Sequence, residues 1–357
     1  MRRLLAVLLV FGFVVACDDD APTGTDGEVE FTVMTRNIYV GSDIDLLMLA
    51  PSLEEIPLLA AEAWLAIQGT DFADRVEALA DEIEAAGPHL VGLQEVSLFR
   101  AQSPGDFLVG NPQPATTVVL DHLDLLLDAL EARGLSYREV AVSQGMDVEV
   151  PMAVSPTEFD DMRLTDHEVI LARNDVYVSN VDERNFTTNL EIELGGPGGP
   201  ALTVLRGWVA VDATTGGKTV RFVSTHLEPP EYAPAVQLAQ AAELMSELAG
   251  ETLPVIVLGD LNSNADGTST TTYADFLAAG YSDAWAEAGA GAGLTCCHQD
   301  DLQNATTELV KRIDYILFRG ALEALSADVV GDDPAERTAG GLWASDHAGV
   351  VATLRAP

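Results

Sequence analysis

The sequence predicts an α/β fold in which β-α-β units and hairpins together build mixed β-sheets. From residue 29 onward, short alternating apolar runs are separated by apolar stripes with helical spacing. Glycine-rich segments at 195–200 and 216–217 join neighbouring strand-like runs, which predicts hairpins. Because β-α-β units give parallel neighbours and hairpins give antiparallel ones, we expect sheets of mixed type.

The N-terminus has the pattern of an export signal. Arg2 and Arg3 precede an apolar run at 4–16 that is too short to span a bilayer. The run ends Val14-Val15-Ala16-Cys17, which resembles a bacterial lipobox, where cleavage before the cysteine leaves it to carry lipid. We expect an exported, membrane-anchored lipoprotein on the periplasmic or extracellular face, with ordinary secretion as the alternative. The predicted parts are a signal peptide at 1–16, the lipidated Cys17 with a flexible acidic spacer at 17–28, and one domain at 29–357.

The charge of the chain limits its partners. The 357 residues carry a formal net charge of −39, and Lys218 and Lys311 are the only lysines. A polyanion of this kind repels DNA and RNA at long range, so a small phosphoester is a better substrate than long nucleic acid. A saline habitat would explain the acidity equally well. We expect a monomer.

The first half of the domain reads as a β-α-β unit followed by a further helix and strand. The alternating run at 29–37 ends at Asn37, and the helical stripe at 72–83 ends before Gly87-Pro88. The run at 89–93 then leads to Gln94-Glu95. The next expected elements are a helix over 123–130 and a strand over 169–172.

The second half adds hairpins and an interior strand. Strand-like segments lie around residue 190, at 202–211 and at 219–227. A helix is expected over 233–248, and the continuous apolar run at 255–258 predicts a strand covered on both faces. The last two strands, 312–318 and 349–354, are expected to complete a second sheet.

Asn37 and Glu95 end neighbouring strands and could face one cleft. Mg²⁺ prefers oxygen ligands, usually one or two carboxylates with waters retained. Glu95 is therefore the first candidate for a metal ligand. A solvated strand end is the simpler interpretation of this segment taken alone.

Asp260 and Asn262 form a stronger segment, Gly259-Asp260-Leu261-Asn262. If the strand continues, the two polar side chains point to the same side, and Gly259 leaves room for close approach. Asp260 would bind or polarise a water or the leaving oxygen, and Asn262 would donate to a phosphoryl oxygen. An Asx turn is the alternative.

Two histidines and a buried acid supply proton-transfer groups. His226 ends an apolar run, and His347 follows Asp346 as an exposed imidazole before the final strand. Asp314 lies inside the strand-like run 312–317, where a buried carboxylate needs a partner. We pair Asp314 with His347, because a histidine held by an acid is a common general base.

Two other segments remain open at this point. Asp166 or His167, within 164–173, could reach the pocket, although a loop cap is the simpler interpretation. Arg206 could contact phosphate or pair with a surface acid. Cys296 and Cys297 are adjacent, and we expect two packed thiols or an odd loop, because no C-x-x-C partner supports zinc binding at His298.

Taken in order, the motifs resemble the endonuclease/exonuclease/phosphatase superfamily, which includes deoxyribonuclease I, exonuclease III type enzymes, bacterial neutral sphingomyelinases and inositol polyphosphate 5-phosphatases. The resemblance covers residues 29–355. Arg36 stands where an aromatic is common, and His89 where an Asp is frequent. The matching segments are Thr35-Arg36-Asn37, Leu93-Gln94-Glu95-Val96, Ser224-Thr225-His226-Leu227, Gly259-Asp260-Leu261-Asn262, Arg312-Ile313-Asp314-Tyr315 and Ser345-Asp346-His347.

This resemblance implies a four-layer α/β sandwich with the site at one edge between two sheets. Carried over residue by residue, it implies that Asn37, Glu95 and Asp346 bind Mg²⁺, with Mn²⁺ as the alternative. It further implies that His226 stabilises the phosphoryl oxygens or leaving group, and that His347, oriented by Asp314, activates water. The implied activity is metal-dependent phosphoester hydrolysis, as phosphodiesterase or phosphatase. An extracellular nuclease is the runner-up, and a catalytically inactive scaffold on this fold is the alternative of another class.

Overall fold

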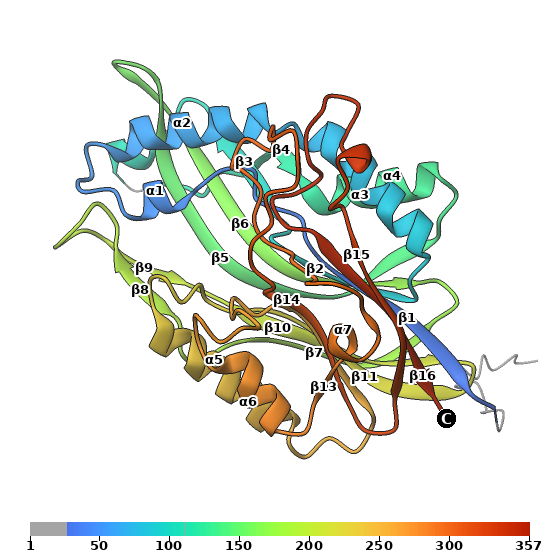
Figure 1. The fold of residues 1–357 in the computed structure, drawn as a ribbon. Coiled ribbons are helices and arrows are strands. Elements are labelled where there is room, and N and C mark those ends of the chain that lie inside the picture. Colours follow the sequence, from blue (N-terminus) through green and yellow to red (C-terminus); the bar gives the residue numbers. More distant parts are fainter. Residues whose placement is uncertain (1–26, 111) are drawn as a thin grey trace, which may run out of the picture.

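The computed structural model describes residues 27–110 and 112–357, and within them two large sheets pack face to face with helices on both outer sides (Figure 1). The predicted signal peptide, Cys17 and most of the spacer lie outside the described residues. No helix in the described part of the chain is long and apolar enough to cross a membrane.

The first sheet has eight strands and is mixed. Only β1 and β2 run parallel in it; the other pairs are antiparallel, and β5 pairs with β6 as a long hairpin. Its strands follow the order β15 (Glu323–Val330), β16 (Gly349–Ala356), β1 (Val29–Asn37), β2 (Leu90–Gln94), β6 (Glu158–Arg173), β3 (Leu98–Gln102) and β4 (Thr117–Asp121), with β5 (Tyr137–Ser155) on β6.

The second sheet has six strands, and β11 and β12 are its parallel pair. β12 lies between β11 and β14, which confirms it as an interior strand. The order is β13 (Ser282–Asp283), β14 (Asp314–Arg319), β12 (Val255–Asp260), β11 (Lys218–His226), β10 (Gly207–Thr215) and β7 (Tyr177–Asn185). The glycine-rich segments do form hairpins: β10 with β11, and a separate ribbon of β8 (Leu190–Glu193) with β9 (Ala201–Val204).

One expectation about the sheets is wrong. The last two predicted strands do not lie in one sheet, because β14 pairs with β12 whereas β16 pairs with β1 and β15. Both strands are buried and apolar, and that pattern carries no information about the partner strand.

Helices cover the outer face of each sheet. α2 (Ile56–Gly69), α3 (Phe72–Ala86) and α4 (His122–Ala132) lie on the eight-stranded side, and α5 (Pro234–Leu248) and α6 (Thr272–Ala278) on the six-stranded side (Figure 1). The expected helices at 72–83, 123–130 and 233–248 are thereby confirmed. Short helices α1 (Asp45–Met48) and α7 (Ala284–Ala288) and 3₁₀ turns at Phe107–Val109 and Pro334–Glu336 complete the described elements.

Three apolar layers hold this sandwich together. Phe31, Phe222 and Ile256 belong to the core between the sheets. Leu79 of α3 and Leu244 of α5 belong to the two outer cores, where helices cover the sheets. Because both sheets have a helix-covered face and a sheet-covered face, this is the four-layer α/β sandwich that the sequence predicted.

Gly92 lies at a close contact between the two sheets. A Cβ at this position would overlap the side chains of Leu258 and Ser224 on the opposite sheet. Beside it, Gln94 Nε2 donates to Ser224 Oγ at 3.0 Å. This contact fixes the end of β2 relative to β11, and with it the residues that follow each strand.

Candidate active site

The candidate active site lies where the strand ends of both sheets meet. Asn37 and Gln94 are opposite each other at the ends of β1 and β2, so Glu95 leaves the sheet beside Asn37. On the facing sheet His226 pairs with Asp260, and Asp260 pairs with Asp314, at the ends of β11 and β12 and the start of β14. Polar side chains from segments as far apart in the sequence as Asn37 and Asp314 therefore lie at one edge of the sandwich.

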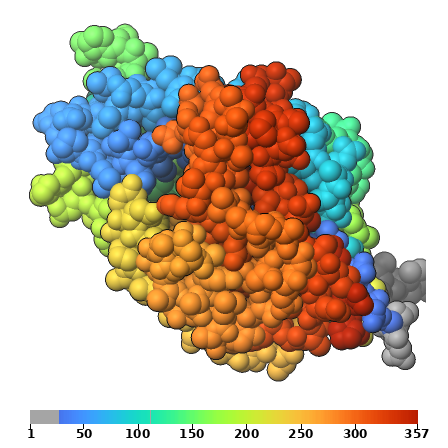
Figure 2. Space-filling model, viewed as in Figure 1, coloured from blue at the N-terminus to red at the C-terminus, as the bar shows by residue number. Residues whose placement is uncertain are grey.

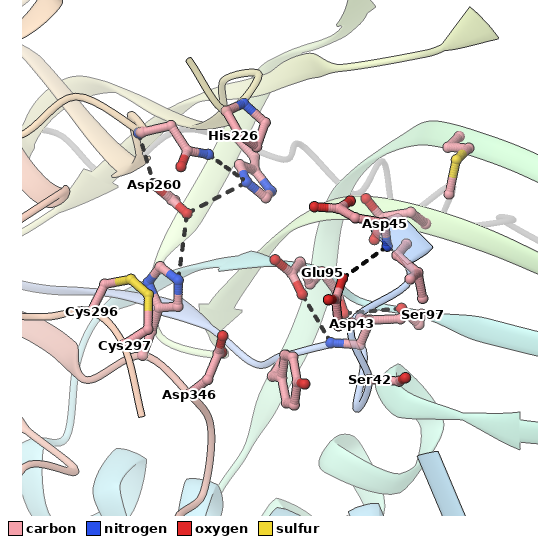
Figure 3. A pocket seen from close by; sticks show the side chains of 18 of the residues that line it. Ser42, Asp43, Asp45, Glu95, Ser97, His226, Asp260, Cys296, Cys297 and Asp346 are labelled. Atoms are coloured by element: carbon pink, nitrogen blue, oxygen red, sulfur yellow. Dashed lines mark hydrogen bonds and ion pairs between the residues drawn. A yellow bond between two sulfur atoms is a disulfide. The ribbon is translucent and has the colours of Figure 1, made fainter. Parts of the chain in front are cut away.

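Glu95, His226 and Asp260 line one cavity of about 350 Å³, whereas Asn37 and Asp314 contact these residues from outside its lining. In Figure 2 the surface is hollowed between the blue part of the chain, which includes α1, and the yellow and orange parts. Figure 3 shows Glu95 and Asp346 in this pocket, with Cys296 and Cys297 on the side of Asp346 and with Asp43 and Asp45 across from them. The predicted residues Glu95, His226, Asp260, Asn262, Asp346 and His347 all line the cavity.

Asn37 and Glu95 form one hydrogen-bonded unit. Asn37 Nδ2 donates to Glu95 Oε1 at 2.9 Å, and the backbone N–H of Val40 donates to Glu95 Oε2 at 2.9 Å. Glu95 has a φ of +59°, a left-handed conformation that costs a non-glycine residue about 1–2 kcal/mol. The hydrogen bonds hold the carboxylate in this strained position at the pocket.

Asp346 supplies a second carboxylate to the cavity. Burial, with a smaller contribution from the charge of Glu95, raises the pKa of Asp346 to about 6 against the opposing effect of His347. Two carboxylates and the amide oxygen of Asn37 are the donor types that a hard divalent cation takes. The residues present therefore fit an Mg²⁺ or Mn²⁺ ion.

His347 and Asp314 are paired as the sequence predicted. His347 Nδ1 lies 2.9 Å from Asp314 Oδ2, and Nε2 lies 3.8 Å from Asp260 Oδ2. Burial alone would lower the pKa of His347, but the charges of Asp314, Asp346 and Asp260 outweigh it and raise that pKa well above the ordinary value. Asp314 is the first residue of β14, not a mid-strand residue.

The expectation of an exposed His347 is wrong, because only 5% of its surface is accessible. Its backbone forms a bridge with Cys296, and its carbonyl accepts a hydrogen bond from the Arg36 guanidinium. Arg36 is itself buried in an ion pair with Glu82, at 2.8 Å. The residue that departs from the family pattern thus supports the backbone of the predicted general base.

His226 is held as a neutral imidazole. Arg206 Nη1 lies 2.9 Å from His226 Nδ1. Because a guanidinium can only donate, Nδ1 accepts and Nε2 carries the proton. Nε2 lies 3.4 Å from Asp260 Oδ2, so it can donate to that carboxylate. Burial, with a smaller contribution from Arg206, lowers the pKa of His226 well below its ordinary value.

The turn after β12 differs from the expectation for Asp260 and Asn262. The strand ends at Asp260, and Asn262 has a φ of +49° with its N–H donating to Asp260 Oδ1 at 2.8 Å, so the Asx-turn alternative describes this segment. The expected close approach at Gly259 is confirmed, since its φ is +138° and a Cβ would overlap the Thr225 carbonyl.

Arg206 and Asp166, whose roles the sequence did not decide, belong to a buried ionic cluster. Asp166 belongs to the continuous strand β6, so the loop-cap interpretation is wrong, and it lines the cavity together with Arg206. Burial raises the pKa of Asp166 to about 7. Glu168 and Glu228 complete the cluster. The alternation of Asp166 and Glu168 in one strand was the available signal, because residues two apart share a face.

The adjacent cysteines also differ from the expectation. Cys296 and Cys297 form a disulfide that lines the cavity, instead of two packed thiols. His298, the residue considered for zinc, stacks on Trp343 at 3.9 Å and contacts Asn304 through Nδ1 at 2.9 Å. Nε2 of His298 is buried without a hydrogen-bond partner among the described residues, and His298 does not line the cavity.

Comparison with protein families gives a match over most of this architecture. The model of the endonuclease/exonuclease/phosphatase family matches residues 64–347. The chain belongs to this family. The match includes Glu95, His226, Asp260, Asp314 and His347, and the family assigns the chain to the phosphoester hydrolases. Comparison with curated proteins gives no significant match.

Solved structures of the endonuclease/exonuclease/phosphatase fold superpose over nearly the whole chain. A family protein from Leptotrichia buccalis has a TM-score of 0.54 at 15% identity, over 90% of this chain and 98% of the other. D. rerio TDP2 in complex with a single-strand DNA product gives 0.52 at 15% identity, over 91% and 98%. A mannosyl-6-phosphatase from Bacteroides thetaiotaomicron gives 0.54 at 17% identity, over 91% and 99%. At these identities the similarity shows the fold.

Proposed function

We propose that this chain is a divalent-metal-dependent phosphoester hydrolase that activates water for in-line attack on phosphorus. The observation that carries the proposal is the buried Asp314–His347 pair, whose imidazole lines the same cavity as the carboxylates of Glu95 and Asp346. Such an arrangement provides a proton acceptor and an oxygen-rich cation site within reach of a single substrate. Family membership supports the same class of reaction.

The residues take distinct roles in this proposal. Asp314 accepts from Nδ1–H of His347 and leaves Nε2 to remove the proton of the attacking water. Asp260 lies between Nε2 of His347 and Nε2 of His226, at 3.8 Å and 3.4 Å, where it can orient that water. In the substrate complex the Nε2–H of His226 and the side-chain N–H of Asn262, which here face Asp260 and the Leu227 carbonyl, would donate to the phosphoryl oxygens.

Asn37, Glu95 and Asp346 would hold the cation. When bound there, a divalent ion would polarise the phosphoryl oxygen and lower the pKa of the neighbouring imidazole. Mg²⁺ is the proposed ion, and Mn²⁺ is the alternative with the same preference for oxygen donors.

The cavity supports a small phosphoester as substrate. Its volume of about 350 Å³ lies near the lower end of ligand-sized pockets. One part of the lining is apolar, and the rim is acidic, which opposes a polyanionic strand. A phospholipid head group or a nucleotide meets these constraints better than long nucleic acid. The apolar lining residues include Ile44, Met48, Met146, Leu164 and Val204, and the acids of the rim include Asp43, Asp45 and Asp300.

We also propose that the enzyme is exported and tethered through Cys17, which the lipobox resemblance supports. A tether of this kind would keep the domain at a membrane surface and favour lipid or periplasmic phosphoesters. Solved structures with this fold include a protein crystallised with a DNA product and a sugar phosphatase, so similarity of fold does not identify the substrate.

A substrate panel tests the proposal. Residues 18–357 would be assayed with Mg²⁺, Mn²⁺ or chelator against sphingomyelin, phosphoinositides, nucleotides, duplex DNA and a generic aryl phosphodiester, with the His347→Ala chain as background. We expect cation-dependent hydrolysis of a small phosphoester that the variant lacks. Preferential cleavage of duplex DNA would favour the nuclease, and no turnover of any substrate would favour an inactive scaffold.

A further inference from the structure

The vicinal pair Cys296–Cys297 lies inside the cavity that contains the predicted general base. Cys296 is buried, Cys297 is half-buried, and both line the cavity together with His347 and Asp346. Figure 3 shows the two sulfur atoms on the side of the pocket where Asp346 lies. The two Sγ atoms and an imidazole nitrogen of His347 all lie within 4.8 Å of one another. The proposed hydrolysis uses neither sulfur.

Backbone hydrogen bonds hold this pair in register with the catalytic segment. On one side, Ala348 N donates to Thr295 O and His298 N donates to Asp346 O, both at 2.8 Å. On the other side, Cys296 exchanges hydrogen bonds with Lys311, with N–O distances of 3.0 and 2.8 Å. Because residues on both flanks of the pair are bonded to the segment around His347, opening the disulfide would leave both thiols beside the imidazole.

The imidazole already has the environment of a metal ligand. Its Nδ1 is engaged by Asp314 Oδ2 at 2.9 Å, so Nε2 is the nitrogen that would bind a cation after losing its proton. A histidine whose other nitrogen donates to a carboxylate is the usual arrangement behind a zinc-bound imidazole. Two thiolates and one imidazole make a soft donor set, unlike the oxygen donors of Asn37, Glu95 and Asp346.

We propose that the reduced Cys296–Cys297 pair and His347 form a second metal site, specific for a thiophilic divalent cation such as Zn²⁺, and that its occupation stops hydrolysis. Three protein ligands with water in the fourth position satisfy tetrahedral Zn²⁺. Coordination through His347 removes the proton acceptor from the reaction. The inhibitory consequence rests on the proposed function, whereas metal binding does not.

The redox step balances as an exchange with a dithiol. A dithiol reductant gives two electrons and two protons to the Cys296–Cys297 disulfide and leaves as its own disulfide. Each thiol then loses its proton as the cation binds, because the thiolate is the ligand. Exchange of the two thiolates with a disulfide oxidant reforms the Cys296–Cys297 disulfide and releases the cation; the oxidant takes up two electrons and two protons and leaves as a dithiol. The disulfide form thus keeps the enzyme active in the presence of Zn²⁺.

Equilibrium dialysis with Zn²⁺ tests the site without reference to activity. The purified chain would be compared in its disulfide form and after reduction by a phosphine that is then removed, both with saturating Mg²⁺ to occupy the oxygen donors. We expect the reduced chain to bind about one more Zn²⁺ than the disulfide chain. Equal Zn²⁺ binding by the two forms would overturn the proposal, and this comparison needs no substitution.

Variants identify the ligands. The additional Zn²⁺ should disappear when Cys296→Ser and Cys297→Ser are combined, and His347→Gln should weaken it by at least ~10-fold, the lower end of the effect of disturbing a zinc site. His298→Gln is the matched control, because His298 follows the cysteines but contacts Trp343 and Asn304. An effect of His298→Gln equal to that of His347→Gln would refute the ligand assignment.

Activity completes the test. Zn²⁺ should inhibit the reduced enzyme and leave both the disulfide enzyme and the double serine variant active. If Zn²⁺ binds the reduced chain and hydrolysis continues, the inhibitory role is wrong. If no form hydrolyses any phosphoester, the proposed function fails while the dialysis result for the metal site stands.

Discussion

The pairing of His347 with Asp314 leads to the sharpest prediction about catalysis. If Asp314 orients the imidazole that removes the water proton, the single variants His347→Ala and Asp314→Asn disable the same step. General base catalysis contributes ~10²- to 10⁴-fold, so each variant should lose about that much turnover. Because the lost step is shared, the double variant should lose little more than either single variant.

The pH profile gives this prediction a second, independent readout. Asp314 Oδ2 lies 2.9 Å from His347 Nδ1, and its negative charge favours the imidazolium form and raises the pKa of His347. Removing that charge should therefore lower the pKa of His347. The base works when deprotonated, so turnover falls as pH falls through its pKa. Asp314→Asn should move that acidic limb to lower pH.

The assay is the rate of phosphoester hydrolysis against pH at saturating Mg²⁺, for the wild type, both single variants and the double variant. His298→Ala is the control for the loss of a buried imidazole that does not line the cavity, and it should keep the wild-type acidic limb. If the fold-loss in turnover of the double variant equals the product of the two single losses, Asp314 stabilises the fold and does not act through His347.

Further outcomes follow from the cation site, the Arg36 contact and the tether. Glu95→Gln should weaken Mg²⁺ binding and nearly abolish turnover with the fold intact; full activity of that variant in excess chelator would refute the assignment. Arg36→Met should destabilise the chain by about 3–5 kcal/mol in denaturant titrations, because it leaves Glu82 buried and unpaired, whereas adding Glu82→Leu should restore most of that loss. No recovery in the double variant would show that the contact of Arg36 with the backbone of residue 347 dominates. The intact mass of the membrane-extracted protein should correspond to a chain that begins at Cys17 and carries lipid on that residue. A mature chain that begins elsewhere, or an unmodified Cys17, would refute the proposed lipid anchor.

Strand ends could be predicted from the sequence because local patterns determine them. Alternation placed Asn37 and Glu95 at adjacent ends of parallel strands, and the structure pairs Asn37 with Gln94. A buried acid in an apolar segment needs a partner, which predicted the contact between Asp314 and His347. These inferences required only periodicity and the cost of burying charge.

Other features depended on contacts far apart in the sequence. The apolar pattern of β14 and β16 could not show that the two strands join different sheets. The helix α2 could not be predicted from periodicity, because its apolar residues do not form a single stripe and Leu58 and Leu65 are exposed. The sequence Asp260-Leu261-Asn262 is compatible with either a continuing strand or a turn, so the left-handed conformation of Asn262 could not be predicted from it. The burial of His347 arises from Arg36 and Cys296, which only the folded chain brings to it.

The most direct test of the central claim is hydrolysis of an aryl phosphodiester in ¹⁸O-labelled water with Mg²⁺ present. Water activated by His347 should attack phosphorus, so the label should appear in the phosphate product and the alcohol should stay unlabelled. The His347→Ala chain should produce neither product at the wild-type rate. Label found in the alcohol, or wild-type turnover that persists in that variant, would contradict the account.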